Sequence, residues 1–287
     1  AANESISNYK NYFQYIQTGS SPIYVNGDWF FYLGKRSNEI ANIFPDRIKG
    51  FTTMRHCFEC DTNNSILYAA GDLDDIDTQY VADMRACFQK SNTSQNSVID
   101  ISKWNINYVN DVGYMFANGT NNYGNVLFPD YTTAGTTRPA DCRYIFAGYD
   151  SPYCRLTSVE MGWIDTSYPD KDYYSNMFNN NSKITTITNF SLDYAFDDQN
   201  YQFPSGLTSL TWKPGNHAIA RDYPGDFTLH LQNCTGLDAA PLLASIPAYT
   251  GSYNRTVRLK LAVYNNLTTE QINAFTAKGY SLTHTTS

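Results

Sequence analysis

Cysteine and histidine side chains are the residues of this 287-residue chain whose chemistry would first suggest a metal site or a nucleophile. Cys57-x-x-Cys60 has the spacing of half a zinc site, but the sequence has no second pair at that spacing. The four histidines are scattered, without the spacing of a metal site or catalytic triad: His56, His217, His230 and His284. The sequence therefore predicts no metal, no cofactor and no catalytic residue.

Acidic side chains offer the main catalytic alternative, in the clusters Asp72–Asp77 and Asp165–Asp172. Such clusters could supply the paired carboxylates of a glycosidase or the ligands of a calcium ion. The first cluster has the spacing of a repeated strand-to-turn segment, however, so we favour a solvated edge. A carbohydrate-active enzyme with an acidic cleft stays as the alternative, and mutating Asp74 or Asp75 would test it.

Tyrosine is abundant, with 24 residues in a chain that is 15% aromatic. Tyrosine offers a large amphipathic contact area at low entropic cost, which suits protein or glycan recognition. Covering neighbouring loops is an equally good explanation of these side chains. The candidate binding residues are Tyr123, Tyr131, Tyr149, Tyr153 and Tyr168. Further tyrosines of the same kind are Tyr108, Tyr114, Tyr144, Tyr173 and Tyr174.

The elements that must position these residues belong to a tandem repeat. Ile76–Phe88 (IDTQYVADMRACF) aligns without gaps on Trp104–Phe116 (WNINYVNDVGYMF), 28 residues later. The marker of each unit is a phenylalanine preceded by an apolar residue, with another apolar residue three positions earlier. The marker phenylalanines, spaced by 30, 28, 30 and 32 residues, are Phe58, Phe88, Phe116, Phe146 and Phe178. A period of roughly 30 is typical of a solenoid.

Each unit is expected to contain a short β-strand followed by a short helical turn. Ser97–Ser102 alternates apolar and polar residues as a half-buried strand does, and apolar residues at i, i+3 and i+4 indicate a helical turn. An aspartate before the turn can accept hydrogen bonds from its free N–H groups (Asp83, Asp111 and Asp141). The expected repeat core consists of Phe58, Met84, Phe88, Trp104, Val109, Met115, Phe116, Phe146 and Phe178.

Three cysteines occupy apolar positions of the repeat: Cys57, Cys87 and Cys142. Free cysteine is usually a small buried hydrophobe, so we expect core packing rather than reactivity here. A bridge between Cys142 and Cys154 would need an oxidising compartment, and we do not favour it.

Three segments follow from these patterns. Residues 1–50 are expected to form an N-terminal cap, with a helix followed by a hairpin at Ile23–Leu33 that Asn26-Gly27 signals. Residues 51–215 hold the repeats, and residues 216–287 form a C-terminal αβ capping module.

The C-terminal module has its own signals. We expect a short helix at Pro241–Ile246 and an alternating strand at Val257–Val263. Thr268–Gln271 is a capping box that opens a helix through Ala277, which Gly279 closes.

The two central units resemble the BspA-type leucine-rich repeats of bacterial surface proteins, which read approximately F-D-T-S-x-V-T-D-M-S-x-M-F. The resemblance covers roughly residues 50–215, and it is strong in the two central units. The ending, LHLQNCTGL followed by RLKLAVYNNLTTEQINAFTAKGYSL, is similar to the terminal module of repeat proteins in gut bacteria and their phages. The resemblance implies an α/β leucine-rich-repeat solenoid of short parallel strands and short helical turns, with N- and C-terminal caps.

Composition and resemblance together indicate a class of function. The net charge of −7 and the absence of a Lys/Arg cluster argue against nucleic acid, and no apolar run is long enough for membrane insertion. The resemblance implies a non-enzymatic binding or structural protein that is extracellular, on a bacterial surface or a phage virion. Its expected partner is a protein or glycan on a cell or particle, with a homo-oligomer or a virion assembly partner as further options.

Overall fold

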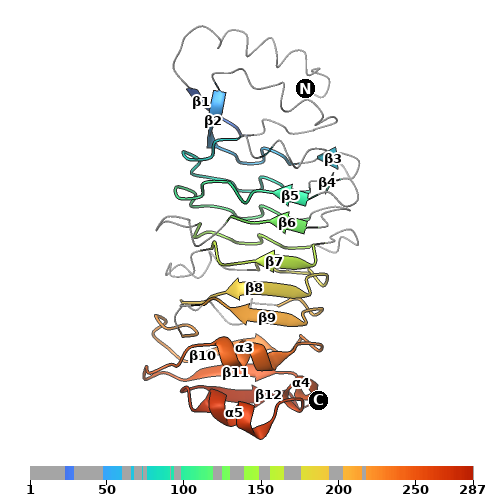
Figure 1. Ribbon diagram of the computed structural model, residues 1–287, viewed down its shortest axis with the longest axis vertical. Helices are drawn as coiled ribbons and strands as arrows, with labels where there is room; N and C mark the ends of the chain where they lie inside the picture. Colours follow the sequence, from blue (N-terminus) through green and yellow to red (C-terminus); the bar gives the residue numbers. More distant parts are fainter. Residues whose placement is uncertain are drawn as a thin grey trace.

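The computed structural model describes residues 23–28, 48–59, 66–67, 73, 76–90, 92–93, 98–118, 125–129, 139–148, 156–164, 176–193, 203–214 and 218–286. Within these residues the chain forms an elongated stack of coils that follows the sequence from one end to the other (Figure 1). The strands of the upper half are β1 (Ile23–Asn26), β2 (Ile48–Thr53), β3 (Ile66–Leu67), β4 (Asn92–Thr93), β5 (Val98–Asp100) and β6 (Asn125–Leu127). The strands of the lower half are β7 (Ser158–Glu160), β8 (Thr186–Phe190), β9 (Ser209–Trp212), β10 (Phe227–Leu231), β11 (Arg255–Leu259) and β12 (Ser281–His284).

Every pair of neighbouring strands in the described residues is parallel. The sheets are short, in the orders β1-β2, β3-β4, β5-β6, β7-β8-β9 and β10-β11-β12. Parallel neighbours need a crossover connection, and here the connection takes the chain round to the equivalent position of the next coil. Val98, for example, pairs with Asn125, about one repeat later in the sequence.

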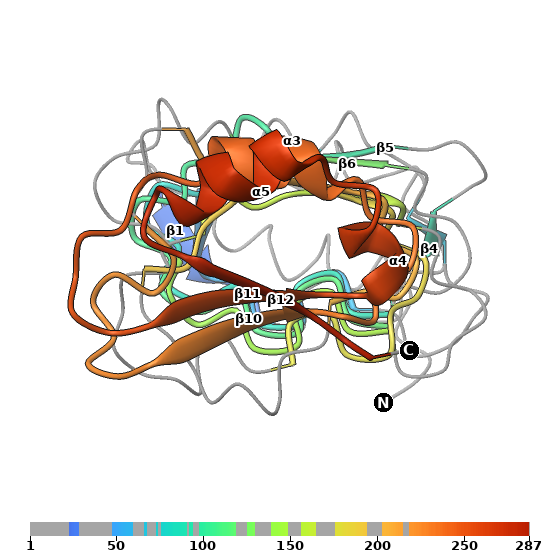
Figure 2. The same cartoon turned by 90° about the horizontal axis from the view of Figure 1, so that it is seen from below.

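The end view shows how the last coils continue the stack (Figure 2). Strands β5 and β6 and helices α3 (Ala239–Ser245) and α5 (Thr269–Thr276) lie along one long side, and β10–β12 lie along the other. The short helix α4 (Leu261–Tyr264) lies at one end of this oblong outline. Helix α3 packs against β9 of the preceding coil, and there the Trp212 N–H donates to Ser245 Oγ at 3.2 Å. The helices thus cover the apolar side of the last strands.

A column of stacked phenylalanine rings forms the centre of the core. The rings of Phe58, Phe88, Phe116, Phe146 and Phe178 follow one another with centroid distances of 5.2, 5.6, 5.8 and 5.8 Å, and their planes are within 10° of parallel. Each such pair adds roughly 0.5–1.5 kcal/mol beyond the burial of its area. The column continues to Phe203, at 6.2 Å from Phe178.

The other residues of the predicted core are buried as well. None exposes more than 4% of its surface: Phe58, Met84, Phe88, Trp104, Val109, Met115, Phe116, Phe146 and Phe178. Trp104 satisfies its indole N–H by donating to the Leu73 carbonyl at 2.9 Å. Cys57, Cys87 and Cys142 are fully buried, as the repeat pattern predicts, and burial raises the pKa of the Cys87 and Cys142 thiols well above the usual range.

The repeated turns are β-turns, and the prediction of helical turns was wrong for the described units. Cys87 N–H donates to the Met84 carbonyl at 3.1 Å, and Ala86 between them has a φ of 56°. A left-handed third residue is the signature of a type II turn and is incompatible with an α-helix. The N–H groups of Met84 and Ala86 donate instead to the main-chain carbonyls of Asp111 and Gly113 in the next coil. Bonding between coils therefore replaces bonding within a helix, while the apolar side chains still point inward.

The predicted hairpin at Ile23–Leu33 was also wrong in the part that the structure describes. Strand β1 pairs in parallel with β2, and the Gly27 N–H continues along this pair by donating to the Thr53 carbonyl at 2.9 Å. Asn26-Gly27 is therefore part of a coil rather than a two-residue turn. The helix predicted within residues 1–20 lies outside the described residues.

The C-terminal module follows its predictions with one change. Helix α3 and helix α5 form as expected, and Thr268 and Gln271 make both hydrogen bonds of the capping box. Gly279 closes α5 with a φ of +90°, and an added Cβ would lie 2.3 Å from the Tyr249 carbonyl oxygen. The predicted strand Val257–Val263 is shorter, because β11 ends at Leu259 and the next residues form α4.

Arg255 is a buried charge that organises this module. Arg255 exposes only 1% of its surface, and its guanidinium lies 4.7 Å from the centroid of the Tyr249 ring. Its N–H groups donate to the main-chain carbonyls of Ile219, Ala220, Tyr223, Gly225 and Asn254. The guanidinium therefore fixes the loop before β10, since it binds four carbonyls of that loop at once: Ile219, Ala220, Tyr223 and Gly225.

Candidate functional site

Two protruding turns each display an exposed tyrosine, and we call them the tyrosine turns (Asp77–Val81 and Asn105–Val109). In the first, the Val81 N–H donates to the Thr78 carbonyl at 3.0 Å, and in the second the Val109 N–H donates to the Ile106 carbonyl at 3.1 Å. Tyr80 and Tyr108 occupy the equivalent position of the two turns, and their exposed fractions are 52% and 63%. One ring therefore projects from each of two successive coils.

The same side-chain device stabilises both turns. Asp77 Oδ1 accepts from the Gln79 N–H at 3.0 Å, and Asn105 Oδ1 accepts from the Asn107 N–H at 3.0 Å. Such bonds from a side chain to the backbone two residues on stabilise a turn locally. The valine that ends each turn is fully buried, which attaches the turn to the core.

The two turns are also joined to each other. Thr78 in the first turn is 98% buried, and its Oγ1 accepts from the Asn105 N–H of the second turn at 2.7 Å. Because this bond crosses from one coil to the next, it fixes the second turn relative to the first. The display is therefore preorganised, which reduces the entropy lost on binding.

The first turn has additional support from β1. Tyr24 donates its hydroxyl to Asp77 Oδ2 at 2.8 Å, and Gln79 Nε2 donates to the same carboxylate at 2.6 Å. This bond to Asp77 raises the pKa of Tyr24. The rings of Tyr24 and Tyr80 meet edge to face with centroids 4.5 Å apart. Tyr80 is thus partly held by a neighbouring ring, whereas Tyr108 makes no ring contact with the described residues.

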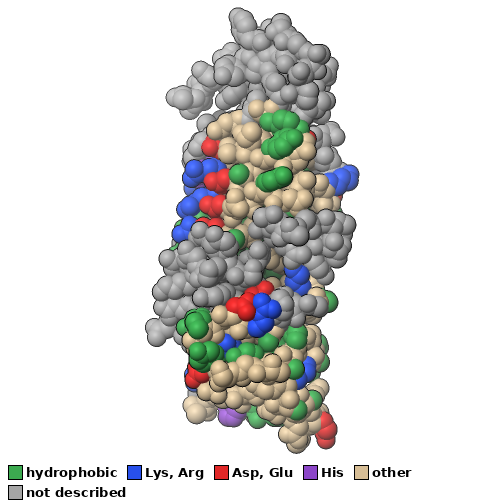
Figure 3. Space-filling model, turned by 90° about the vertical axis from the view of Figure 1, so that its left-hand side faces the viewer, with side chains coloured by type: hydrophobic (Ala, Val, Ile, Leu, Met, Phe, Trp, Pro, Cys, Tyr) green, Lys and Arg blue, Asp and Glu red, His purple; other side chains and the backbone are tan. Residues whose placement is uncertain are grey.

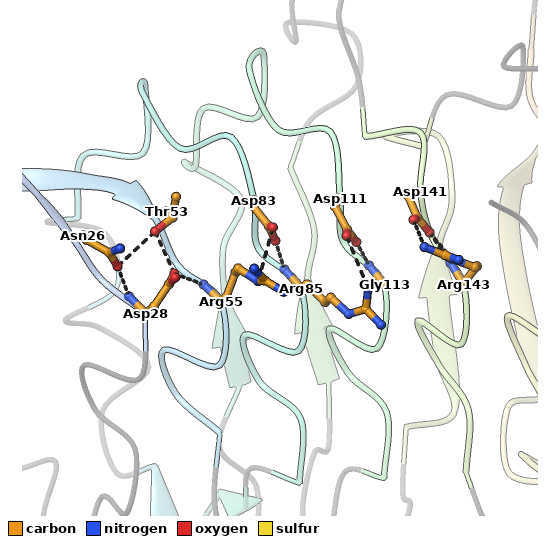
Figure 4. Close-up of polar contacts among 10 residues, drawn as sticks. All are labelled: Asn26, Asp28, Thr53, Arg55, Asp83, Arg85, Asp111, Gly113, Asp141 and Arg143. Carbon is orange, nitrogen blue, oxygen red and sulfur yellow. Dashed lines mark hydrogen bonds and ion pairs between the residues drawn. The ribbon is translucent and has the colours of Figure 1, made fainter. Parts of the chain in front are cut away.

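Beside the tyrosine turns, the start of each repeated β-turn carries an aspartate, and these residues form the aspartate ladder (Asp83, Asp111 and Asp141; Figure 4). Neighbouring members are bridged in parallel through their backbones. Oδ1 of each accepts from the N–H two residues later, at 2.8 Å from Arg85, 2.8 Å from Gly113 and 3.2 Å from Arg143. The predicted capping role of these carboxylates is therefore confirmed, although the element that they cap is a β-turn.

The ladder continues to the first coils with different residues (Figure 4). Asn26 Oδ1 accepts from the Asp28 N–H at 2.7 Å, in the way the aspartates do. Thr53 instead donates its hydroxyl to Asp28 Oδ1 at 2.7 Å, and this oxygen also accepts from the Arg55 N–H at 3.0 Å. Asp28, in the coil above, thus accepts from the Arg55 N–H in place of the residue at the ladder position, Thr53.

Arginines pair with the ladder in a second column. Arg55 Nε lies 3.4 Å from Asp83 Oδ2, Arg85 Nη1 lies 3.9 Å from Asp111 Oδ2, and Arg143 binds Asp141 through two nitrogens. Gly113 stands where the units of Phe58, Phe88 and Phe146 have arginine. Burial, followed by the nearby carboxylates of Asp141 and Asp83, raises the pKa of Asp111 to about 6, against the opposing effects of the Gly113 N–H and Arg85.

The charged column and exposed apolar side chains share one face of the molecule. Figure 3 shows blue and red side chains alternating along one edge of the upper half, with hydrophobic side chains next to them. Tyr114 and Tyr144 belong to the same turns, but their rings stack on each other at 4.8 Å. Arg85 lies over the Tyr114 ring at 5.2 Å, so these two tyrosines are used within the molecule.

The five candidate binding tyrosines lie outside the described residues: Tyr123, Tyr131, Tyr149, Tyr153 and Tyr168. The same holds for Cys60, Cys154, Asp74, Asp75, Tyr173, Tyr174 and the cluster Asp165–Asp172. Tyr108 is described and exposed. The sequence pattern contains the signal for Tyr80 as well, because the alignment of the two central units gives it the same position as Tyr108.

The remaining candidate chemistry is dispersed. His56 Nδ1 lies 2.5 Å from Oε2 of the buried Glu59, and Lys90 Nζ lies 3.6 Å from the other oxygen of that carboxylate. His230 Nδ1 lies 3.0 Å from Gln232 Oε1, in a different coil. Among the described residues, His, Cys, Asp and Glu do not gather in groups of three that could hold a metal ion. No helix in the described part is long and apolar enough to cross a membrane.

Comparison with known proteins gives one match. Residues 35–148 are similar to the family described as "Mycoplasma protein of unknown function, DUF285". This segment is less than half of the chain, and it contains both tyrosine turns and the whole aspartate ladder. The match is consistent with a BspA-type surface repeat, without being specific to that type. No curated protein and no solved structure matches the chain.

Proposed function

We propose that this chain is a BspA-like leucine-rich-repeat solenoid that acts outside the cell as a non-enzymatic binding protein. The parallel pairing of strands one repeat apart and the unbroken column of phenylalanine rings support a solenoid. The similarity of residues 35–148 to a repeat-containing family points in the same direction. The protein would be displayed on a bacterial surface or on a phage virion, where it contacts a protein or a glycan.

The pair of tyrosine turns is the observation that carries the binding role. Tyr80 and Tyr108 expose 52% and 63% of their surface on turns that are hydrogen-bonded internally and to each other. Exposed aromatic residues on a rigid frame are typical of binding hot spots, because their burial gains much free energy for little loss of entropy. The proposal assigns this surface a contact role and no chemical step.

Binding of whole cells and particles tests the proposal. The chain would be immobilised and exposed to intact bacterial cells, isolated envelopes and phage particles, next to a double variant Tyr80→Ala/Tyr108→Ala. We expect retention by the wild type and its loss in the double variant. Tyr253→Ala is the matched control, since Tyr253 is 44% exposed but lies in the C-terminal module. Equal retention by wild type and double variant, or no retention by either, would refute the proposal.

Antibodies raised against the chain test its location. Immunogold labelling of intact cells and of purified virions would show which of the two surfaces carries it. Labelling confined to the cell interior would contradict the extracellular assignment.

A further inference from the structure

We infer that the tyrosine turns bind an uncharged polysaccharide that runs along the stack and crosses Tyr80 and Tyr108 in succession. This inference rests on the binding role proposed above and names the class of partner. Its first basis is the repetition itself. The two turns share their internal hydrogen bonds and present one ring per coil, in register and one coil apart. Two equivalent contacts in a row fit a ligand that is itself made of repeated units. A sugar polymer is such a ligand, whereas the surface of a folded protein generally does not repeat.

The groups around the rings are of the kind that bind sugars. An aromatic ring packs against the C–H face of a pyranose, and neighbouring polar side chains exchange hydrogen bonds with its hydroxyls. Asn105 and Asn110 are exposed beside Tyr108. Asn105 uses its Oδ1 to accept from the Asn107 N–H, which leaves the amide NH₂ directed to solvent or ligand. Beside Tyr80, Gln79 and Asp77 form a fixed polar group with the Tyr24 hydroxyl.

The charges near the turns favour a neutral chain over a charged one. In the neighbouring ladder, Asp83 faces Arg55 and Asp111 faces Arg85, whereas Asp77 in the first turn accepts from the uncharged Tyr24 and Gln79. The residues of the two turns themselves include no Lys or Arg that could bind a sulfated or phosphorylated polymer, and the net charge of −7 opposes a polyanion further. A protein partner would gain from the same tyrosines, but it would not need two equivalent turns at coil spacing.

Affinity electrophoresis gives the direct test. The full chain would be run in native gels that contain dextran, mannan, xylan or hydroxyethyl cellulose, and the retardation would be converted to a dissociation constant. We expect retardation by at least one of these neutral polymers. The double variant Tyr80→Ala/Tyr108→Ala should lower the affinity at least about tenfold, and Tyr80→Phe/Tyr108→Phe should retain most of it, since the rings remain. Tyr253→Ala should bind as the wild type does, and circular dichroism would verify the folding of every variant.

Treated cells separate this inference from the proposal on which it rests. Periodate destroys the vicinal diols of cell-surface glycans, whereas protease removes surface proteins. Tyrosine-dependent cell binding that periodate abolishes and protease spares is the expected result. Tyrosine-dependent binding that survives periodate and is lost after protease would overturn the polysaccharide assignment while leaving the binding role intact. Failure of all four polymers to retard the chain, together with periodate-resistant cell binding, would also overturn it.

Discussion

Replacing Asp111 by asparagine should stabilise the protein at neutral pH and leave its stability nearly unchanged at acid pH. The pKa of this carboxyl is raised from 3.8 to about 6, because it is buried and lies between Asp83 and Asp141. A folded-state pKa above the unfolded value means that folding favours the protonated form. The stabilisation is therefore fully present below about pH 4 and is lost as the pH rises through about 6.

The magnitude follows from the pKa difference. A shift of about two units corresponds to roughly 3 kcal/mol at full value, at about 1.4 kcal/mol per unit. The Asp111 side chain is 22% exposed, and solvent screening reduces such effects, so we expect about 1 kcal/mol. Asparagine keeps the carbonyl oxygen that accepts from the Gly113 N–H, and Asn26 in the first coil already performs this role. The lost contact with Arg85 is long, at 3.9 Å, and costs little.

Urea unfolding followed by circular dichroism, from about pH 4 to about pH 8, measures this difference. Midpoints are compared, because repeat proteins do not always unfold in one step. Asp83→Asn is the matched control, since the same ladder position there faces Arg55 at 3.4 Å and neutralisation should give no stabilisation at neutral pH. A variant Asp111→Asn that is equally stabilised at both ends of the pH range, or destabilised at the upper end, would refute this account of the ladder.

Three further changes test the packing. Phe116→Ala should lower the free energy of unfolding, measured in urea, by about 3–5 kcal/mol, because the Phe116 ring stacks between Phe88 and Phe146 and its removal leaves a cavity. A loss below about 1 kcal/mol would contradict a role of the phenylalanine column in the core. Arg255→Lys should lower the same free energy by roughly 3 kcal/mol, since one ammonium cannot satisfy the carbonyls that the guanidinium serves. Thr268→Ala should cost about 1 kcal/mol through loss of the α5 cap, and hydrogen exchange should show the difference first in that helix.

The apolar pattern predicted which side chains are buried better than it predicted the backbone. Residues at i, i+3 and i+4 point to one side in a helical turn, and they also do so in the turn around Met84 and Cys87. The two alternatives differ in where the N–H groups bond, and that depends on the adjacent coil. The role of Phe203 depends on the adjacent coil too, since only the stack brings its ring next to Phe178.

The candidate surface shows a similar division. The sequence pointed to tyrosines as the residues of interest and placed Tyr108 among them, but exposure was not readable from residue type. Tyr114 and Tyr144 are also tyrosines of the repeat, yet they stack on each other. Only the coil arrangement distinguishes a ring that projects from one that packs against its neighbour.

The sequence by itself determined the repeat, its inward-facing residues, the aspartates before three of the turns and the capping box of the last helix. These features are local, because each depends on residues within one unit and on their periodic recurrence. The tertiary structure decided the type II turns, the parallel course of β1, the pairing of arginines with the ladder and the raised pKa of Asp111. Each of these depends on a hydrogen bond or a charge supplied by an adjacent coil, and that neighbour is defined only when the chain has folded.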